Sequence, residues 1–151
     1  MVISDPTVTL ETEQAEREII ACAVRAPGLW ERLRHVRPDW FTHWSDQAIW
    51  RAIQASHEEN GCFEVAVVKR WLQEYFPDDT DALLDRLASI ATDYLHAEFI
   101  DFYLTNLERS GERLAIRRWA GYVSEMCESG YPFNEIIQAI ASPPVQIGGA
   151  A

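Results

Sequence analysis

Apolar residues recur at every third or fourth position along most of the chain, and this periodicity constrains the fold more than any other feature. Ala15, Ile19 and Cys22 follow this spacing near the start, and similar runs continue to about residue 141. Such spacing puts apolar side chains on one face of a helix, whereas a half-buried strand requires strict alternation. The sequence shows no alternating segment of useful length, no repeat and no internal linker. We therefore predict an all-α fold: a compact multi-helix domain with a long C-terminal helical extension or hairpin.

Prolines, glycines and capping residues set the predicted boundaries. We expect an extended lead-in over residues 1–9, because Pro6 keeps Asp5 out of helical geometry. A helical domain follows over residues 10–141, and residues 142–151 form a flexible tail or the start of a linker. Ser45 is the expected N-cap of the third helix, and Asn60-Gly61 is its expected C-terminal signal. A long helical region is expected over residues 93–129, and we interpret Ser110-Gly111 within it as a bend or a short connection.

The expected helices each carry a predicted inward face. The second helix begins near Pro27, a fourth covers residues 64–76, and the last covers residues 134–141. Core positions at helical spacing are expected at Ile49, Trp50, Ile53, His57, Val65, Val68, Leu72, Tyr75, Leu83, Leu84, Leu87, Ile90, Phe99, Phe102, Tyr103 and Leu107.

The charge balance excludes several classes of function. The chain has 13 Lys and Arg against 24 Asp and Glu, for a net charge of −11. Phosphate backbones would repel such a chain, so little direct nucleic-acid binding is expected. Its single lysine, Lys69, does not follow a glycine, and a phosphate-binding loop needs a Gly-Lys pair. We therefore expect no nucleotide site, no catalytic residues and no cofactor in this chain.

The metal-ligating residue types are scattered. Cys22, Cys62 and Cys127 form no close pair with one another, and no two of the four histidines are closely spaced. An EF-hand starting at Asp78 would need glycine and glutamate where Leu83 and Ser89 stand. We therefore expect no metal. The odd number of cysteines, the lack of a long apolar run and the lack of a secretory signal predict a cytoplasmic protein without membrane contact.

Arginines stand out against this acidic background. Arg109, Arg113 and Arg117 lie four residues apart, so they share one face if the helix is continuous, and Arg118 lies beside them. They either form salt bridges with Glu108, Glu112 or a neighbouring helix, or they dock an acidic partner surface or a local phosphate.

An aromatic stripe continues the same helical region. Trp119, Tyr122 and Met126 belong either to the intramolecular core or to an interface, because a helix this long projects beyond a small domain. With Arg113 and Arg117 they form our candidate protein interface, through which we expect a homodimer or higher oligomer.

Three segments carry a resemblance to a known family. The first is Gln-Ala-Glu-Arg-Glu-Ile-Ile-Ala-Cys at residues 14–22. The second is Pro-Asp-Trp-Phe-Thr-His-Trp-Ser-Asp-Gln-Ala-Ile-Trp at residues 38–50. The third begins with Ile-Arg-Arg-Trp at residues 116–119 and runs through Glu-Met to Gly-Tyr at residues 130–131. In this order they resemble the N-terminal domain of replicative DnaB-type DNA helicases, over about residues 14–141.

The resemblance implies a non-catalytic role. In that family this domain forms a collar above the ATPase ring, pairs through a helical hairpin, and contacts primase or helicase-loading proteins. The motor belongs to a separate C-terminal domain. The chain is then either a fragment of a helicase or a stand-alone protein that binds helicase, primase or loader. Two other classes stay open: a helical DNA-binding regulator, which the net charge disfavours, and a small helical enzyme of unknown substrate.

Overall fold

The computed structural model describes residues 6–93 and 96–144, with side chains from residue 12 onward. Within these residues all regular structure is helical, which confirms the predicted all-α class. The elements are α1 (Pro6–Arg25), η1 (Pro27–Leu29), α2 (Trp30–Leu33), η2 (Pro38–Trp40), α3 (Trp44–Asn60), α4 (Val65–Tyr75), α5 (Thr80–Thr92), η3 (Ala97–Phe99), α6 (Ile100–Glu128) and α7 (Phe133–Ile140).

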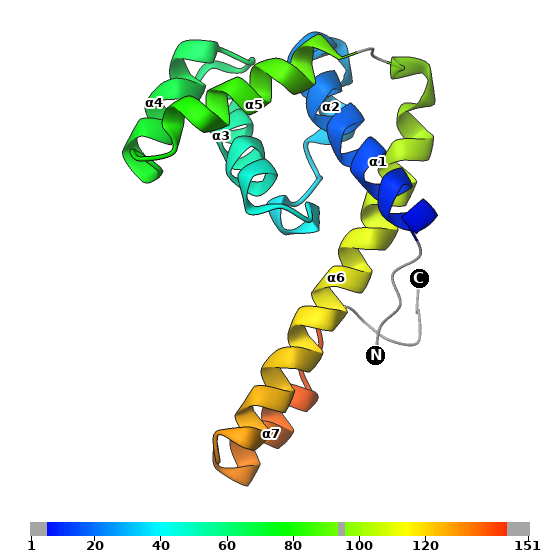
Figure 1. The fold of residues 1–151 in the computed structure, drawn as a ribbon, viewed down its shortest axis with the longest axis vertical. Helices are drawn as coiled ribbons and strands as arrows, with labels where there is room; N and C mark the ends of the chain where they lie inside the picture. Colours follow the sequence, from blue (N-terminus) through cyan, green and yellow to red (C-terminus); the bar gives the residue numbers. More distant parts are fainter. Residues whose placement is uncertain (1–5, 94–95, 145–151) are drawn as a thin grey trace.

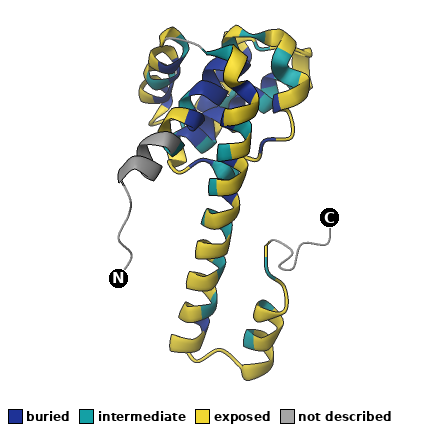
Figure 2. Ribbon diagram, turned by 90° about the vertical axis from the view of Figure 1, so that its right-hand side faces the viewer, coloured by how far each residue is buried: buried dark blue, intermediate teal, exposed yellow. Residues whose placement is uncertain are grey.

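The molecule has a compact head and a projecting hairpin. Helices α1 to α5 form the head, and α6 packs along α1 before it leaves the head (Figure 1). Helix α7 lies beside the distal half of α6 and runs back toward the head (Figure 1). Buried residues gather in the head, whereas most of the projecting part is exposed (Figure 2). At 1.5 Å per residue, the 29 residues of α6 span roughly 43 Å.

Large apolar side chains from α1 and α3 form the centre of the head. Ile19 and Ile53 have no exposed surface, and neither has Trp50, whose indole Nε1 donates a 2.9 Å hydrogen bond to the carbonyl of Val36. The ring of Phe41 lies 5.4 Å from that of Trp50. A buried indole with a satisfied N–H contributes a large apolar area without the cost of an unpaired donor.

Two buried carboxylates tie the helices of the head together. Asp46 on α3, 1% exposed, accepts hydrogen bonds from Nε and one terminal nitrogen of Arg86 on α5, at 2.6 and 2.9 Å. Glu16 on α1 is equally buried and accepts a 2.5 Å hydrogen bond from the backbone N–H of Thr42. Burial raises the pKa of Glu16, although the hydrogen bonds from Thr42 act in the opposite direction.

The start of the chain differs from the prediction. Helix α1 begins at Pro6, so the expectation of an extended segment is wrong for residues 6–9, and residues 1–5 lie outside the described part. Pro6 restricts the residue before it but is itself favoured in the first turn of a helix. A backbone N–H at that position has no acceptor within the helix, so proline loses no hydrogen bond there. Ser45 is likewise not the N-cap of α3, because His43 occupies that position.

Other sequence predictions are confirmed or corrected by packing. Gly61 ends α3 with a φ of 72°, as expected for the left-handed C-terminal residue. Val65 and Tyr75 of α4 are both 58% exposed rather than buried, and Val67 takes the inward place at 6%. Phe99 and Phe102 are exposed as well, at 53% and 60%. The long helix begins at Ile100 rather than near residue 93.

Of the two alternatives predicted at Ser110-Gly111, the short connection is wrong, because α6 continues through both residues. The Ser110 hydroxyl donates to the carbonyls of Asn106 and Leu107, which keeps the side chain within the helix. Gly111 faces Trp40 of η2, and a Cβ added there would lie 2.6 Å from Trp40 Cδ1 and 2.7 Å from Trp40 Cβ. The glycine therefore permits a close approach between the head and α6.

This approach can be tested with two substitutions in the same helix. Gly111→Ala and Gly121→Ala both gain helix propensity, but nothing lies within 4 Å of a Cβ at Gly121. We expect Gly111→Ala to have a free energy of unfolding about 1–3 kcal/mol lower than Gly121→Ala, because Trp40 must move. Urea unfolding of both variants measures the difference, and equal stabilities would contradict the proposed contact.

The buried Glu16 carboxyl predicts a pH dependence. Its pKa in the folded chain lies above the value of 4.5 expected for the unfolded chain. Between the unfolded and the folded pKa, the folded state therefore binds more protons than the unfolded state. Stability from this group is therefore present at low pH and lost as the pH rises through the folded pKa. Glu16→Gln keeps an acceptor for Thr42 and removes the titration. Urea unfolding from pH 4.5 to 8 should show the unmodified chain losing stability relative to this variant, and a constant difference would refute the assignment.

Candidate functional site

The projecting hairpin is the part of the described structure that contains the predicted interface residues. Helix α6 ends at Glu128, Gly130 turns the chain with a φ of 72°, and α7 begins at Phe133. The backbone N–H of Tyr131 donates a 3.1 Å hydrogen bond to the carbonyl of Met126, which closes the turn. A positive φ suits glycine because no Cβ clashes there. The sequence signal Gly-Tyr-Pro thus folds the chain back on α6.

The structure divides the predicted aromatic stripe. Trp119 is half-buried, and its Nε1 donates a 2.9 Å hydrogen bond to the carbonyl of Ala139 on α7. Met126 is 4% exposed, so it is buried within the chain, whereas Tyr122 is 54% exposed. Trp119 and Met126 therefore hold the hairpin together, and Tyr122 is the member of the stripe that is open to a partner. The interface role of these residues stays a prediction.

Helix α7 carries apolar side chains on two faces. Ile136 and Ala139 are half-buried, on the side of the helix from which Ala139 accepts the Trp119 hydrogen bond. Phe133, Ile137 and Ile140, at positions i, i+4 and i+7, are 78%, 47% and 47% exposed. We call these three residues the outer face of α7. Sequence reasoning missed it, although apolar residues on two faces of one short helix are a readable signal of a second contact.

The arginines of α6 extend along its exposed surface. Arg109, Arg113 and Arg117 are exposed, and no hydrogen bond or salt bridge is found for them within residues 12–93 and 96–144. The predicted pairing with Glu108 or Glu112 is therefore not observed. Arg118 differs, because it donates a 3.1 Å hydrogen bond to the carbonyl of Asp39 and so helps fasten η2 to α6.

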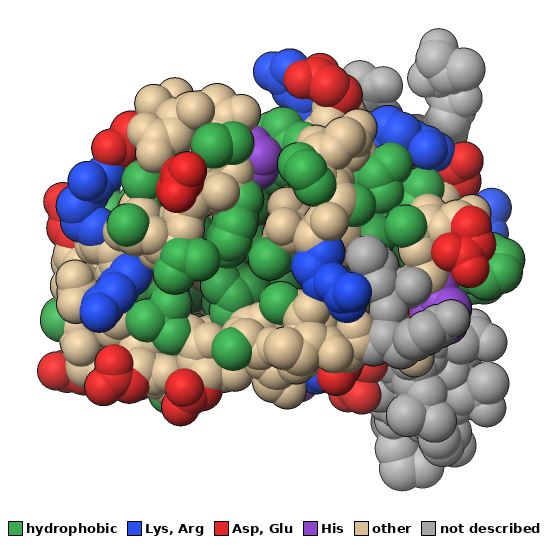
Figure 3. All heavy atoms as spheres, turned by 90° about the horizontal axis from the view of Figure 1, so that it is seen from above, with side chains coloured by type: hydrophobic (Ala, Val, Ile, Leu, Met, Phe, Trp, Pro, Cys, Tyr) green, Lys and Arg blue, Asp and Glu red, His purple; other side chains and the backbone are tan. Residues whose placement is uncertain are grey.

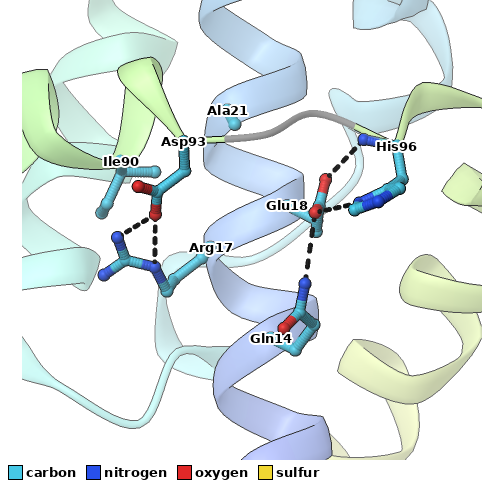
Figure 4. Close-up of a pocket in the computed structure, with 7 residues that line it drawn as sticks. All are labelled: Gln14, Arg17, Glu18, Ala21, Ile90, Asp93 and His96. Carbon is cyan, nitrogen blue, oxygen red and sulfur yellow. Dashed lines mark hydrogen bonds and ion pairs between the residues drawn. The ribbon is translucent and has the colours of Figure 1, made fainter.

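A cavity of about 230 Å³ lies in the head near the end of α5 (Figure 4). Its buried carboxylate, Glu18, accepts hydrogen bonds from the His96 backbone N–H at 3.1 Å and from Gln14 Nε2 at 3.3 Å, and it pairs with His96 Nδ1 at 2.9 Å. Arg17 pairs with Asp93 across the same opening (Figure 4). These groups satisfy one another, so the cluster fastens the segment after α5 to α1.

The neighbouring thiol is not poised for chemistry. Burial, and secondarily the Glu18 carboxylate, raise the pKa of Cys22 to about 11. A thiol with such a pKa is protonated at neutral pH and is a poor nucleophile. Cys22 is a small core residue of α1.

A second cavity, of about 310 Å³, lies beside Trp30 and His57. The two rings stack with centroids 3.7 Å apart and planes 2° apart. Burial lowers the pKa of His57, and neither ring nitrogen has a hydrogen-bond partner in the described part of the chain. Glu31, Arg34 and Glu58 bring charges of both signs to the opening, so no ligand class is favoured. The upper surface of the head shows a similar mixture, with apolar side chains in a shallow hollow between charged ones (Figure 3).

Among residues 6–93 and 96–144, no helix is both long enough and apolar enough to pass through a bilayer. No group of three or more His, Cys, Asp or Glu side chains is placed to hold a metal ion in that part of the chain.

Comparisons with known proteins add no family assignment. No protein-family model matches the chain, and a search of curated proteins finds no relative.

Proposed function

We propose that this chain is a non-catalytic assembly and partner-docking domain of the DNA replication machinery. The proposal covers both a collar domain of a DnaB-type helicase and a stand-alone protein of that kind that binds helicase, primase or loader. The observation that carries it is the hairpin of α6 and α7, which projects from the head with an apolar outer face that no other part of the described chain covers. The resemblance of three segments to the DnaB-type N-terminal domain supports the choice of machinery.

The hairpin's exposed residues have the composition of an interface. Phe133, Ile137 and Ile140 supply apolar area, Tyr122 adds an aromatic ring, and Arg113 and Arg117 lie on the same helix as Tyr122. Aromatic residues and arginine concentrate binding energy in protein interfaces. We expect the outer face of α7 to contact the same face of a second copy, because a two-fold interface uses one patch on both subunits and two apolar patches complement each other.

Self-association through the outer face of α7 is the first test. Phe133→Ser and Ile137→Ser should each cost about 2 kcal/mol of dimer affinity, roughly thirtyfold in Kd, measured by sedimentation equilibrium. Both side chains are exposed, so stability of the monomer should change by no more than about 0.5 kcal/mol. Phe102→Ser removes another exposed aromatic, at the head end of α6, and serves as the control with unchanged self-association.

Trp119→Ala is a less direct probe of the interface. Because Trp119 bonds to α7, its loss should loosen the hairpin and weaken self-association indirectly. A chain that is monomeric at millimolar concentration before any substitution would rule out the self-association part of the proposal.

Binding to replication proteins tests the function itself. The purified chain should form a complex with at least one of the replicative helicase, the primase and the helicase loader of its own source, detected by sedimentation velocity. Single- and double-stranded DNA should bind only at roughly millimolar concentration at physiological salt, because the net charge is −11. If the chain binds none of the three proteins, the proposal is overturned. Submicromolar, salt-dependent binding of DNA would favour a DNA-binding regulator.

A further inference from the structure

A surface of the head, separate from the hairpin, combines exposed aromatic rings with carboxylates. Four rings form a continuous chain: Trp44 lies 6.0 Å from Phe76, Phe76 lies 6.0 Å from Trp71, and Trp71 lies 4.6 Å from Tyr75. The two ends of this chain are open, since Trp44 is 54% and Tyr75 is 58% exposed. We call these four residues the aromatic chain. They join the start of α3 to the end of α4.

The aromatic chain is not part of the core. Trp71 and Phe76 are half-buried against the core, and they support the two exposed rings from below. Large aromatic side chains gain most from burial, so two of them left open at the ends of one chain of contacting rings mark a binding surface rather than a fold requirement. Neither Trp44 nor Tyr75 belongs to the hairpin, so this surface is separate from the outer face of α7.

Exposed carboxylates adjoin the aromatic chain in the sequence, and we call them its acidic border. Asp78 and Asp79 follow Phe76 directly after Pro77, and the Asp79 backbone N–H donates a 3.1 Å hydrogen bond to the Phe76 carbonyl. This bond holds the acidic turn at residues 77–79 against the backbone of Phe76. Glu74 precedes Tyr75, and it and both aspartates are exposed without a salt bridge among the described residues. Asp46, two residues after Trp44, is already engaged by Arg86 of α5.

We propose that the aromatic chain and its acidic border dock an arginine-bearing peptide segment of a partner protein. A guanidinium group stacks its plane on indole and phenol rings, and its fork of N–H donors pairs with a carboxylate. Exposed rings beside carboxylates offer both interactions at once, and the chain's net charge of −11 attracts a cationic segment from a distance. A lysine offers the charge without the planar stacking group.

The same surface does not suit a nucleic acid. Bases stack on aromatic rings only where a positive groove also holds the backbone, and here the border is acidic. The unpaired arginines Arg109, Arg113 and Arg117 belong to α6 rather than to α3 or α4, which carry the aromatic chain. The proposal deepens the partner-docking part of the proposed function but uses another surface, so it does not depend on pairing of the hairpins.

The test uses two fluorescein-labelled dodecapeptides in which serine alternates with arginine or with lysine, and fluorescence anisotropy as the readout. The arginine peptide should bind with a Kd of roughly 10–100 µM, and the lysine peptide at least fivefold more weakly. Trp44→Ala and Tyr75→Ala should each weaken arginine-peptide binding at least fivefold. Tyr122→Ala removes an equally exposed aromatic ring from the hairpin and should leave binding unchanged.

The acidic border is tested with a matched pair of charge changes. Asp79→Asn should weaken binding of the arginine peptide at least threefold, whereas Glu128→Gln removes one negative charge at the end of α6 and should not. If Trp44→Ala lowers the cooperativity of urea unfolding, Tyr75→Ala and Asp79→Asn decide the question by themselves.

Three outcomes would overturn the proposal. Equal binding of both peptides, insensitive to the aromatic substitutions, would show general charge attraction. No binding at 1 mM peptide would show that the surface does not take arginine. Self-association that is lost in both Tyr75→Ala and Arg113→Ala would show that a second copy of this chain is the occupant.

The measurements are repeated on the Phe133→Ser chain. Peptide binding that persists there while self-association is lost shows that the head surface works without the hairpin. Self-association that persists while peptide binding fails overturns this proposal alone and leaves the proposed function standing.

Discussion

The close approach of Trp40 to Gly111 determines how the two halves of the molecule are joined. The indole of Trp40 occupies the space of a Cβ at Gly111, so η2 rests directly on the backbone of α6. Arg118, two turns further along α6, donates to the carbonyl of Asp39 and extends the contact. Because α6 is one rigid helix through this point, its direction at the head fixes where Trp119, Tyr122 and α7 lie. A helix that carried a larger residue at position 111 would tilt, and the hairpin would move with it.

This contact also explains what sequence reasoning could and could not predict. Glycine is an unfavourable residue within a helix, so Ser110-Gly111 taken alone predicts a bend or a short connection. The reason for the glycine is Trp40, which lies 71 positions earlier in the sequence, and no local pattern reveals such a partner. The all-α class, the C-terminal signal at Gly61 and most inner faces were predictable because they depend on local periodicity and capping.

The candidate site was predictable only in part, for a related reason. Spacing identified Trp119, Tyr122 and Met126 as one stripe, but their exposure depends on the folded hairpin, in which Met126 is buried and Trp119 bonds to α7. In the same way Tyr75 has helical core spacing, yet α4 turns it outward at the edge of the head. Periodicity assigns residues to a face of a helix, and only tertiary packing decides whether that face meets another element.

The distribution of charge links the two proposed surfaces. Within the head, Asp46 and Glu18 are buried and satisfied by Arg86, His96 and Gln14, so these carboxylates stabilise helix packing. The remaining excess of negative charge lies outside, including the turn after α4, whereas the unpaired arginines follow one face of α6.

If two chains pair through the outer face of α7, the dimer presents two aromatic chains at a fixed separation set by the two α6 helices. A partner with two arginine-bearing segments would then bind the second site as an intramolecular step. Its affinity for the dimer would exceed that for one head by a factor equal to the effective concentration of the second segment divided by the Kd of that segment, provided that the linker between the segments spans the distance. In such a dimer, α6 would convert a weak docking surface into a strong one without any additional contact.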